Sequence, residues 1–370
     1  MTRGAARVGE PVTAIDTPAL VVDLDAMQRN LERMARFARD HHVRLRPHAK
    51  MHKSAVIAKR QIEAGAVGVC VQKLSEAEAL ADGGVADIFI SNEIIAPAKL
   101  ARVADLARRT RLAIAVDSAL GVERLAAALK SAGSKVEVFV EIDVGQGRCG
   151  VAPAAAGALA HQVVSQGLAF AGVQAYHGRA QHLRSAAERE AAVRHAVRLA
   201  RAAQAVITSS GIHCPLVTGA GTGTFAFEAA SGVYGELQAG SYLFMDRDYA
   251  DNEATPNAPR FEHALFVKSQ VMSRGTSHAV VDAGHKAHAI DSGLPRVWGR
   301  DLEFANGGDE HGILRPRSDA LPQLGDTVWL IPGHCDPTVN LHDHYVVVSG
   351  GLEQGVVAAL WAVDARGCLA

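Results

Sequence analysis

The chain has few of the features that assign a protein to a special class. Its five cysteines are scattered, at Cys70, Cys149, Cys214, Cys335 and Cys368. An odd, scattered set argues against a disulfide framework and is typical of a reducing compartment. A formal net charge of -1 gives no electrostatic reason to bind nucleic acid or an anionic membrane surface. The first ten residues lack the apolar stretch of a leader, and no later run reaches membrane-spanning length. We therefore expect a cytoplasmic protein that binds neither nucleic acid nor membrane.

Short apolar runs with strand character alternate with Ala-rich stretches of helical period over the first 225 residues. The predicted strands are 17–24, 43–50, 68–72, 87–91, 111–117, 136–144, 168–177 and 215–219. The predicted helices are 25–39, capped by Asp25, and 54–64, 75–81, 97–109, 119–132, 153–166 and 184–209. Such alternation indicates βαβ units with parallel strands, and six or seven of them favour a TIM-type (β/α)8 barrel over a doubly wound sheet.

The pattern changes after about residue 250. With 370 residues, 48% of them hydrophobic, the chain is long enough for one large domain and a smaller one. Residues 256–259 are typical of a linker, and the predicted strands beyond it are 264–272, 279–282, 327–331, 344–348 and 356–359. We predict a barrel over residues 25–250 and a smaller, mostly β domain over residues 258–370, to which residues 17–24 are expected to add a strand.

A lysine stands between two histidines in the stretch 45–53, Leu-Arg-Pro-His-Ala-Lys-Met-His-Lys. In extended backbone His48, Lys50 and His52 share one face. Burying an ammonium is costly unless it is paired or neutralised, and a neutral lysine amine is the nucleophile that condenses with an aldehyde. The alternative is a basic strand end in solvent. A barrel favours the first interpretation, because its catalytic residues lie at the carboxyl ends of strands.

A glycine- and threonine-rich stretch, residues 218–224, follows another predicted strand. Glycines let backbone N–H groups turn toward a phosphate, and threonine hydroxyls add donors, although a tight turn alone also explains the pattern. A dinucleotide fingerprint belongs in the first βα turn, whereas this stretch lies late in the barrel, where phosphate sites are commonly built. A site for a single phosphate is therefore predicted.

Two more strand ends carry candidate residues. Arg148 lies among glycines, and in a barrel mouth its permanent charge would keep a neighbouring heteroaromatic nitrogen unprotonated; the alternative is a surface arginine in a flexible loop. Tyr176, His177 and His182 end the next strand, and a histidine there is a candidate general base because it titrates near neutral pH. Each histidine by itself is more often structural.

Residues 332–343 contain a candidate metal clamp. In extended backbone His334 and Asp336 point the same way while Cys335 points away. An imidazole nitrogen with a carboxylate oxygen suits manganese, cobalt, magnesium or zinc. The alternative is a polar hairpin turn, because a His-x-Asp pattern alone has low specificity.

Four separated stretches together resemble the D-threonine aldolase family. They are Arg46–Lys53, Asp143–Gly150, Gln238–Tyr242 and Gly333–Thr338, and the resemblance extends from Thr17 to about Gly367. That family belongs to the fold-type III pyridoxal phosphate (PLP) enzymes, which resemble alanine racemase in pairing a PLP-binding barrel with a β domain. The resemblance also implies a homodimer in which each β domain completes the partner's site.

The resemblance implies a role for each candidate residue. Lys50 would bind PLP covalently, and Arg148 would face its pyridine nitrogen. The residues near the phosphate would be Tyr176, Thr222, Gly223, Gly240 and Ser241. His334 and Asp336 would bind a divalent metal ion, and His182 is the candidate base.

The implied reaction is cleavage of D-threonine and related D-β-hydroxy-α-amino acids to glycine and an aldehyde. PLP would accept the electrons of the breaking bond, the metal would lower the pKa of the β-hydroxyl, and His182 would remove its proton. An alternative on the same scaffold is a D-serine or D-threo-3-hydroxyaspartate dehydratase. As that family is understood, a cysteine lies two places after the metal-binding histidine, whereas Asp336 stands there in this chain.

Two alternatives come from other classes. A non-catalytic PLP-binding protein would need no metal clamp, and a metal-dependent hydrolase without PLP would leave the lysine, the arginine and the phosphate loop unexplained. Glu310 and His311 receive no role from the sequence.

Overall fold

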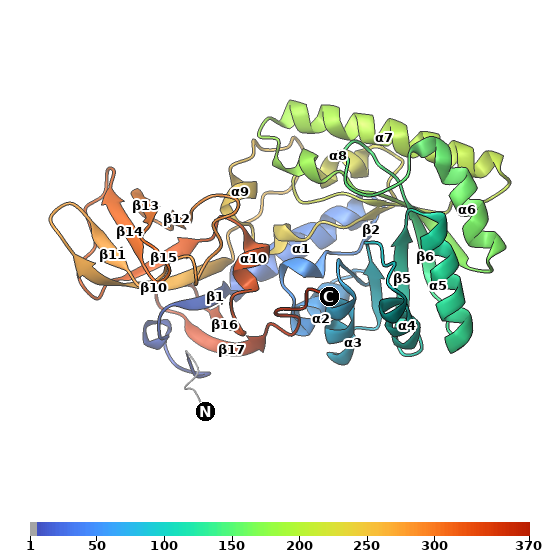
Figure 1. The fold of residues 1–370 in the computed structure, drawn as a ribbon. Coiled ribbons are helices and arrows are strands. Elements are labelled where there is room, and N and C mark those ends of the chain that lie inside the picture. Colours follow the sequence, from blue (N-terminus) through green and yellow to red (C-terminus); the bar gives the residue numbers. More distant parts are fainter. Residues whose placement is uncertain (1–5) are drawn as a thin grey trace.

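The computed structural model describes residues 6–370, which form two sheets (Figure 1). An eight-stranded parallel sheet has the strand order β2-β9-β8-β7-β6-β5-β4-β3. Its edge strands β2 and β3 meet through a parallel bridge between His48 and Cys70, so the sheet closes into a barrel. The strands are β2 (Arg44–Leu45), β3 (Val69–Val71), β4 (Asp87–Ile90), β5 (Arg111–Val116), β6 (Glu137–Glu141), β7 (Ala169–Ala175), β8 (Val217–Gly219) and β9 (Glu236–Leu237). The predicted α/β barrel is confirmed.

Helices connect these strands and lie outside the barrel (Figure 1). They are α2 (Ala55–Glu63), α3 (Leu74–Asp82), α4 (Pro97–Leu106), α5 (Ala119–Ala132), α6 (Ala156–Ser165), α7 (Ala186–Ser209) and α8 (Phe225–Ala230). One apolar core fills the space between helices and strands. A smaller core fills the barrel interior, where the rings of Phe89 and Phe139 lie 4.7 Å apart. The barrel is therefore packed with side chains and leaves its mouth for a site.

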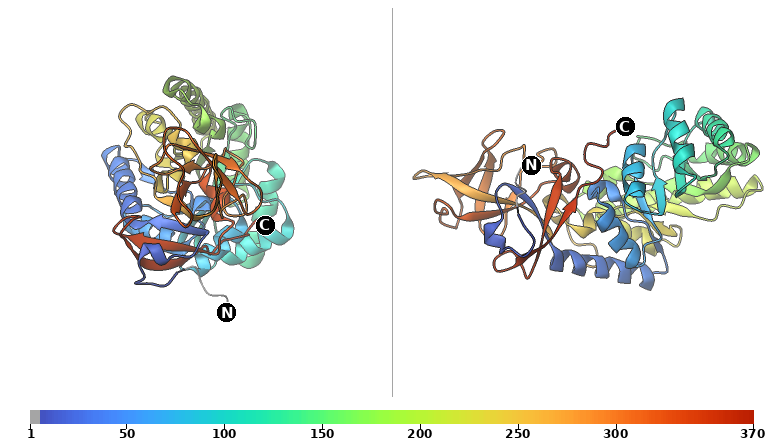
Figure 2. Two further views of the ribbon diagram at one scale, coloured as in Figure 1. Left: turned by 90° about the vertical axis from the view of Figure 1, so that its left-hand side faces the viewer. Right: turned by 90° about the horizontal axis from the view of Figure 1, so that it is seen from below.

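A nine-stranded sheet makes up the predicted β domain. Its strands are β1 (Ala19–Asp23), β10 (Leu265–Arg274), β11 (Ala279–Val281), β12 (Arg296–Val297), β13 (Leu302–Asn306), β14 (Gly312–Pro316), β15 (Thr327–Ile331), β16 (His344–Ser349) and β17 (Val356–Ala362). The strand β1 lies between β10 and β16, antiparallel to the first and parallel to the second. Residues 17–24 thus contribute a strand to this sheet, which lies at one end of the barrel (Figures 1 and 2).

The helix α1 (Leu24–Asp40) joins the two sheets, because it begins directly after β1 and the chain then enters the barrel. Its N-cap is Asp23, whose carboxylate accepts hydrogen bonds from the backbone N–H groups of Asp25 and Ala26. The expected cap, Asp25, was therefore wrong by two residues: it lies inside the first turn. Either position places a carboxylate near the positive end of the helix dipole.

The stretch around Lys50 differs most from its predicted structure. The strand β2 ends at Leu45, and Ala49–Met51 form a 3-10 turn in place of the expected extended backbone. His48 and Lys50 still face the barrel mouth, but His52 is fully buried and lies within hydrogen-bonding distance of Gln61. The prediction that His48, Lys50 and His52 share one face was therefore wrong, because a turn of this kind does not keep the period of two.

The short strands β9, β12, β13 and β14 were not predicted. Their apolar runs are brief and interrupted by glycine and charged residues, so the periodicity is weak. Two short helices accompany this sheet. The helix α9 (Arg247–Ala250) precedes β10, and the helix α10 (Cys335–Val339) lies between β15 and β16. Within residues 6–370, no helix has the length and apolar character needed to cross a membrane.

Candidate active site

A cavity of about 420 Å³ opens where the barrel mouth faces the helix α10 of the β domain. It brings together nine of the ten residues predicted from the sequence: Lys50, Arg148, Tyr176, His182, Thr222, Gly240, Ser241, His334 and Asp336, with Gly221 beside them. These residues come from both sheets and from positions almost 290 residues apart. Their shared cavity is the candidate active site.

Gly223 is the predicted residue that does not line this cavity. Its backbone N–H donates to the side-chain oxygen of Gln181 at 3.0 Å. A Cβ at this position would lie 2.5 Å from the carbonyl oxygen of Gln181. Gly223 therefore allows the close approach of two backbone segments behind the cavity.

Lys50 and Asp336 form an ion pair across the cavity, with 2.8 Å between Nζ and Oδ2. The carboxylate of Asp336 raises the pKa of Lys50 above its ordinary value. Burial opposes ionisation of Asp336, but the Lys50 ammonium and His334 outweigh it and lower the pKa of Asp336 to about 2. The barrel lysine and the β-domain carboxylate thus hold each other charged.

His334 lies beside Asp336 and is oriented by a second carboxylate. Its Nδ1 lies 2.7 Å from Oδ2 of Asp291, and its Nε2 lies 3.7 Å from Oδ1 of Asp336. Nδ1–H donates to Asp291, and Nε2 faces Asp336, where the neutral imidazole would offer its lone pair to a metal ion. His334 is the N-cap of α10 in extended backbone, and Asp336 lies in the first turn of that helix, so both side chains line the cavity.

A divalent ion fits the clamp that these two residues form. Oδ1 of Asp336 is buried and has no hydrogen-bond partner among residues 6–370. An orphaned carboxylate oxygen next to a free imidazole nitrogen matches the mixed nitrogen and oxygen ligands of first-row metals and magnesium. Cys335 is fully buried and bonded through its backbone N–H to Asp246, so its sulfur does not take part.

The residues predicted near a phosphate also line the cavity. They are Thr222, Gly240 and Ser241, with Gly221 beside them. A Cβ at Gly240 would lie 2.7 Å from the carbonyl oxygen of His48, so only glycine permits the chain to pass there. A glycine- and threonine-rich lining leaves room for the phosphate of PLP, and the Lys50 amine fits its aldehyde.

Arg148 also lines the cavity. Its guanidinium carbon is 5.7 Å from the ring centroid of Tyr176, a cation–π contact. Its Nη2 is also 3.9 Å from Oε1 of Glu141. Burial raises the pKa of the Tyr176 phenol, so the residue acts as a neutral donor at neutral pH.

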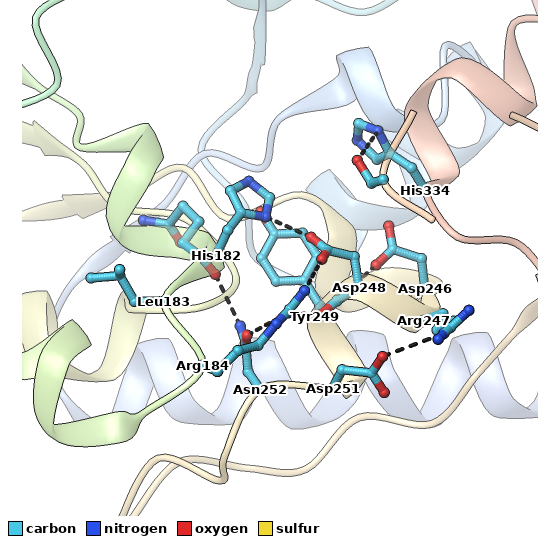
Figure 3. A network of polar contacts seen from close by, with 12 residues as sticks. His182, Leu183, Arg184, Asp246, Arg247, Asp248, Tyr249, Asp251, Asn252 and His334 are labelled. Carbon is cyan, nitrogen blue, oxygen red and sulfur yellow. Dashed lines mark hydrogen bonds and ion pairs between the residues drawn. The ribbon is translucent and has the colours of Figure 1, made fainter. Parts of the chain in front are cut away.

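His182 lies at the rim and is fixed by a network that includes Arg184 (Figure 3). Its Nδ1 bonds to the carboxylate of Asp248, which also accepts from Arg184. Burial opposes ionisation of Asp248, but the bonds from His182 and Arg184 dominate and lower its pKa to about 2. With Nδ1 engaged by a carboxylate, Nε2 of His182 is free to accept a proton.

Several site residues received no predicted role. Asp291 and Asp248 orient the two histidines, and other cavity-lining residues are His48, Gln72, Gln146, Gln174, Arg179, Gln238 and Tyr249. Of these, His48, Gln146 and Gln238 lie in the quoted motifs, whereas the others stand outside them and reach the site only through the tertiary fold. Glu310, for which the sequence offered no role, forms an exposed ion pair with Lys286.

Comparisons with known proteins agree with the fold. Residues 22–248 match the family described as "Alanine racemase, N-terminal domain", and residues 264–348 match the "Putative serine dehydratase domain". The D-threonine aldolase of Arthrobacter sp is 46% identical, covering 98% of this chain and 96% of its own. The 3-hydroxy-D-aspartate aldolase of Paracoccus denitrificans (strain Pd 1222) is 42% identical, covering 97% and 94%. The D-threo-3-hydroxyaspartate dehydratase of Delftia sp. (strain HT23) is 32% identical, covering 89% and 93%.

A solved structure is similar over the full length. The crystal structure of D-threonine aldolase from Filomicrobium marinum superimposes with a TM-score of 0.96 and 46% identity, covering 100% of both chains. The fold and the matched domains define a fold-type III PLP enzyme of the alanine racemase type. Within this class, the chain belongs to the D-threonine aldolase family.

Proposed function

We propose that this lyase cleaves D-threonine and related D-β-hydroxy-α-amino acids to glycine and an aldehyde, using PLP and a divalent metal ion. The observation that carries the proposal is the convergence of the Lys50 amine with His334 and Asp336 in one cavity. An amine from the barrel and a clamp from the β domain supply both requirements of a metal-assisted PLP lyase.

The residues then divide the chemistry between them. Lys50 would hold PLP, which when bound supplies an electron sink for the bond that breaks at Cα. His334 and Asp336 would hold the metal ion, whose charge favours ionisation of a neighbouring hydroxyl. Nε2 of His182 accepts the β-hydroxyl proton, because its Nδ1 is held by Asp248.

Arg148 and the small residues orient the cofactor. Arg148 would face the pyridine nitrogen and keep it unprotonated, because a guanidinium does not give up its proton. The residues proposed near the phosphate are Tyr176, Thr222, Gly240 and Ser241, and Gly223 supports them from behind.

Absorbance spectra and product analysis test the proposal. Purified protein is given D-threonine with and without manganese, and acetaldehyde, glycine and ammonia are assayed separately. Acetaldehyde with glycine, lost on chelation, is the expected result. Ammonia with a 2-oxo acid would instead assign the dehydratase reaction, and the absence of a PLP absorbance band would overturn the proposal entirely.

Replacing Asp336 by cysteine tests what sets the reaction type. The residue two places after the clamp histidine is aspartate here, and its Oδ1 is the orphaned oxygen of the clamp. If this ligand favours aldol cleavage, Asp336→Cys loses acetaldehyde production while it keeps its PLP spectrum. Unchanged cleavage in the variant would mean that the ligand does not determine the chemistry.

The proposal keeps three further expectations from the sequence. The chain would fold as a barrel over residues 25–250 and a β domain over residues 258–370, it would form a homodimer, and it would work in the cytoplasm. Light scattering of the purified protein tests the dimer. A mass of one chain would contradict it.

A further inference from the structure

A second group of ionisable side chains lies at the ends of three neighbouring barrel strands. Glu93 follows β4, Asp117 directly follows β5, and Cys149 lies in the loop after β6. One ligand atom from each of the three lies within 4.8 Å of the others. A fourth residue, Glu141, is the last residue of β6 and adjoins Glu93. We call these four residues the strand-end cluster.

The carboxylates of the strand-end cluster are not balanced by nearby positive charge. Both carboxylate oxygens of Glu93 and Oε2 of Glu141 are buried, and within the described part of the chain no donor from outside the cluster reaches them. Glu93 makes its side-chain hydrogen bonds with two other members of the cluster, Glu141 and Cys149. Glu141 itself is only 3% exposed. The nearby Arg148 stays 3.9 Å from Oε1 of Glu141, which is longer than a hydrogen bond. Buried carboxylate oxygens without donors are rare, because each unpaired group costs desolvation free energy.

The electrostatic consequences agree with this geometry. Burial, followed by Glu93, raises the pKa of Glu141 to about 9. The same two causes raise the pKa of the Cys149 thiol to about 11. The cluster therefore needs either protons or a cation to balance its charge.

We propose that the strand-end cluster is a second divalent-metal site, with Glu93, Asp117 and Cys149 as ligands and Glu141 beside them. Carboxylate oxygens with one sulfur suit Zn²⁺, which binds as readily to a thiolate as to oxygen. A metal ion satisfies the orphaned oxygens and deprotonates the thiol in one step, whereas protons would satisfy only the carboxyls. This site shares no residue with the His334 and Asp336 clamp, so variants can separate the two ions.

Metal counting on the full-length, PLP-loaded protein tests the site. Chelator-treated protein is dialysed against Zn²⁺ and the bound zinc per chain is measured for the wild type, Asp117→Asn and Asp336→Asn. Asp117→Asn is expected to lose one ion that Asp336→Asn retains. Glu137→Gln is the matched control, because this residue lies at the other end of β6 and pairs with Arg111.

The outcomes separate the two metal proposals. If Asp117→Asn holds as much zinc as the wild type, the strand-end site is overturned. If only Asp336→Asn keeps the wild-type amount, the strand-end site stands and the clamp of the proposed function fails.

Thiol alkylation of the wild type avoids any effect of substitution on folding. Iodoacetamide labelling is followed residue by residue with mass spectrometry, with and without Zn²⁺. Zinc is expected to slow the labelling of Cys149 by about tenfold or more, because a metal-bound thiolate is not free to react. Cys214, which contacts a backbone carbonyl away from the cluster, is the internal reference. Equal labelling of Cys149 in both conditions overturns the proposal.

Discussion

Asp336 and Glu141 are two largely buried carboxyl groups near the barrel mouth, and their pKa values shift in opposite directions. Asp336 lies 2.8 Å from the Lys50 ammonium, and its pKa falls to about 2. Glu141 lies beside Glu93 with no comparably close cation, and its pKa rises to about 9. Burial favours the neutral acid in both places, so the partner decides the sign.

This difference follows from how each cluster is assembled. Lys50 lies in a turn of the barrel and Asp336 in the helix α10 of the β domain, so opposite charges meet where the two face each other. The strand-end cluster comes from adjacent strands of one sheet, which deliver like charges to one place. A site built between two units can balance its own charge, while a site built at one edge needs an added ion.

Replacing Lys50 is expected to have the largest effect. Lys50→Ala and Lys50→Arg should both lose activity by a factor on the order of 10⁴ or more, because neither side chain offers an amine nucleophile. Only Lys50→Ala removes the cation beside Asp336, so only this variant should melt at a lower temperature in chelator. Steady-state assays and thermal melts measure the two effects. Equal melting temperatures would show that the ion pair does not stabilise the fold.

Replacing His182 tests the role of the rim network. His182→Asn is expected to lower kcat about 100-fold, because proton transfer from the β-hydroxyl loses its acceptor. The absorbance of bound PLP should stay unchanged. His213→Asn, in an exposed loop, is the control. A rise in KM alone, with kcat retained, would make His182 a substrate-binding residue, and the base would then be another group.

Replacing Asp291 tests whether this carboxylate orients His334. Its carboxylate holds His334 through Nδ1, so Asp291→Asn should weaken metal binding about tenfold while activity returns at high metal concentration. Metal titrations of activity measure the shift. Asp309→Asn is the matched control, since Asp309 is an exposed aspartate of the same sheet that pairs with Lys286. Activity that no metal concentration restores would contradict an orienting role.

Replacing Glu141 is expected to have the smallest effect, a pH-dependent change in melting temperature. Because its folded-state pKa of about 9 lies above the ordinary 4.5, folding retains its proton, and metal-free stability should fall as pH rises from about 4.5 to about 9. Glu141→Gln is neutral throughout, so its melting temperature in chelator should exceed the wild type's by roughly a few degrees at the high end of this range. If the melting temperatures of both proteins depend on pH in the same way, ionisation of Glu141 does not lower the stability of the fold.

The bounds of some elements in both domains follow from local pattern. The helix Ala119–Ala132 and the strand Thr327–Ile331 have the predicted bounds, because each is a strongly periodic run with clear ends: Ser118 and Gly133 flank the helix as caps. The short strand Glu236–Leu237 has no such pattern. It is a strand because its neighbours β2 and β8 supply hydrogen bonds on both sides.

The same division holds for the site. Lys50, Arg148, His334 and Asp336 stand in recognisable motifs, and the structure brings them to one cavity. Asp291 and Asp248 stand in none, because an orienting carboxylate needs only the right position in space. Nor does any motif join Glu93, Asp117 and Cys149, which become neighbours through the parallel order of β4, β5 and β6.

The sequence by itself determined the alternation of strands and helices, the change to a β domain, and the residue types at positions 50, 334 and 336. These depend on period, composition and residue type, which are local properties. Tertiary structure alone decided that Lys50 meets Asp336, that His182 and His334 each have a carboxylate behind them, and that four ionisable side chains gather at the strand ends. Those contacts depend on the closure of the barrel and the placement of the second sheet, because charge and hydrogen bonding act over distances in space rather than along the chain.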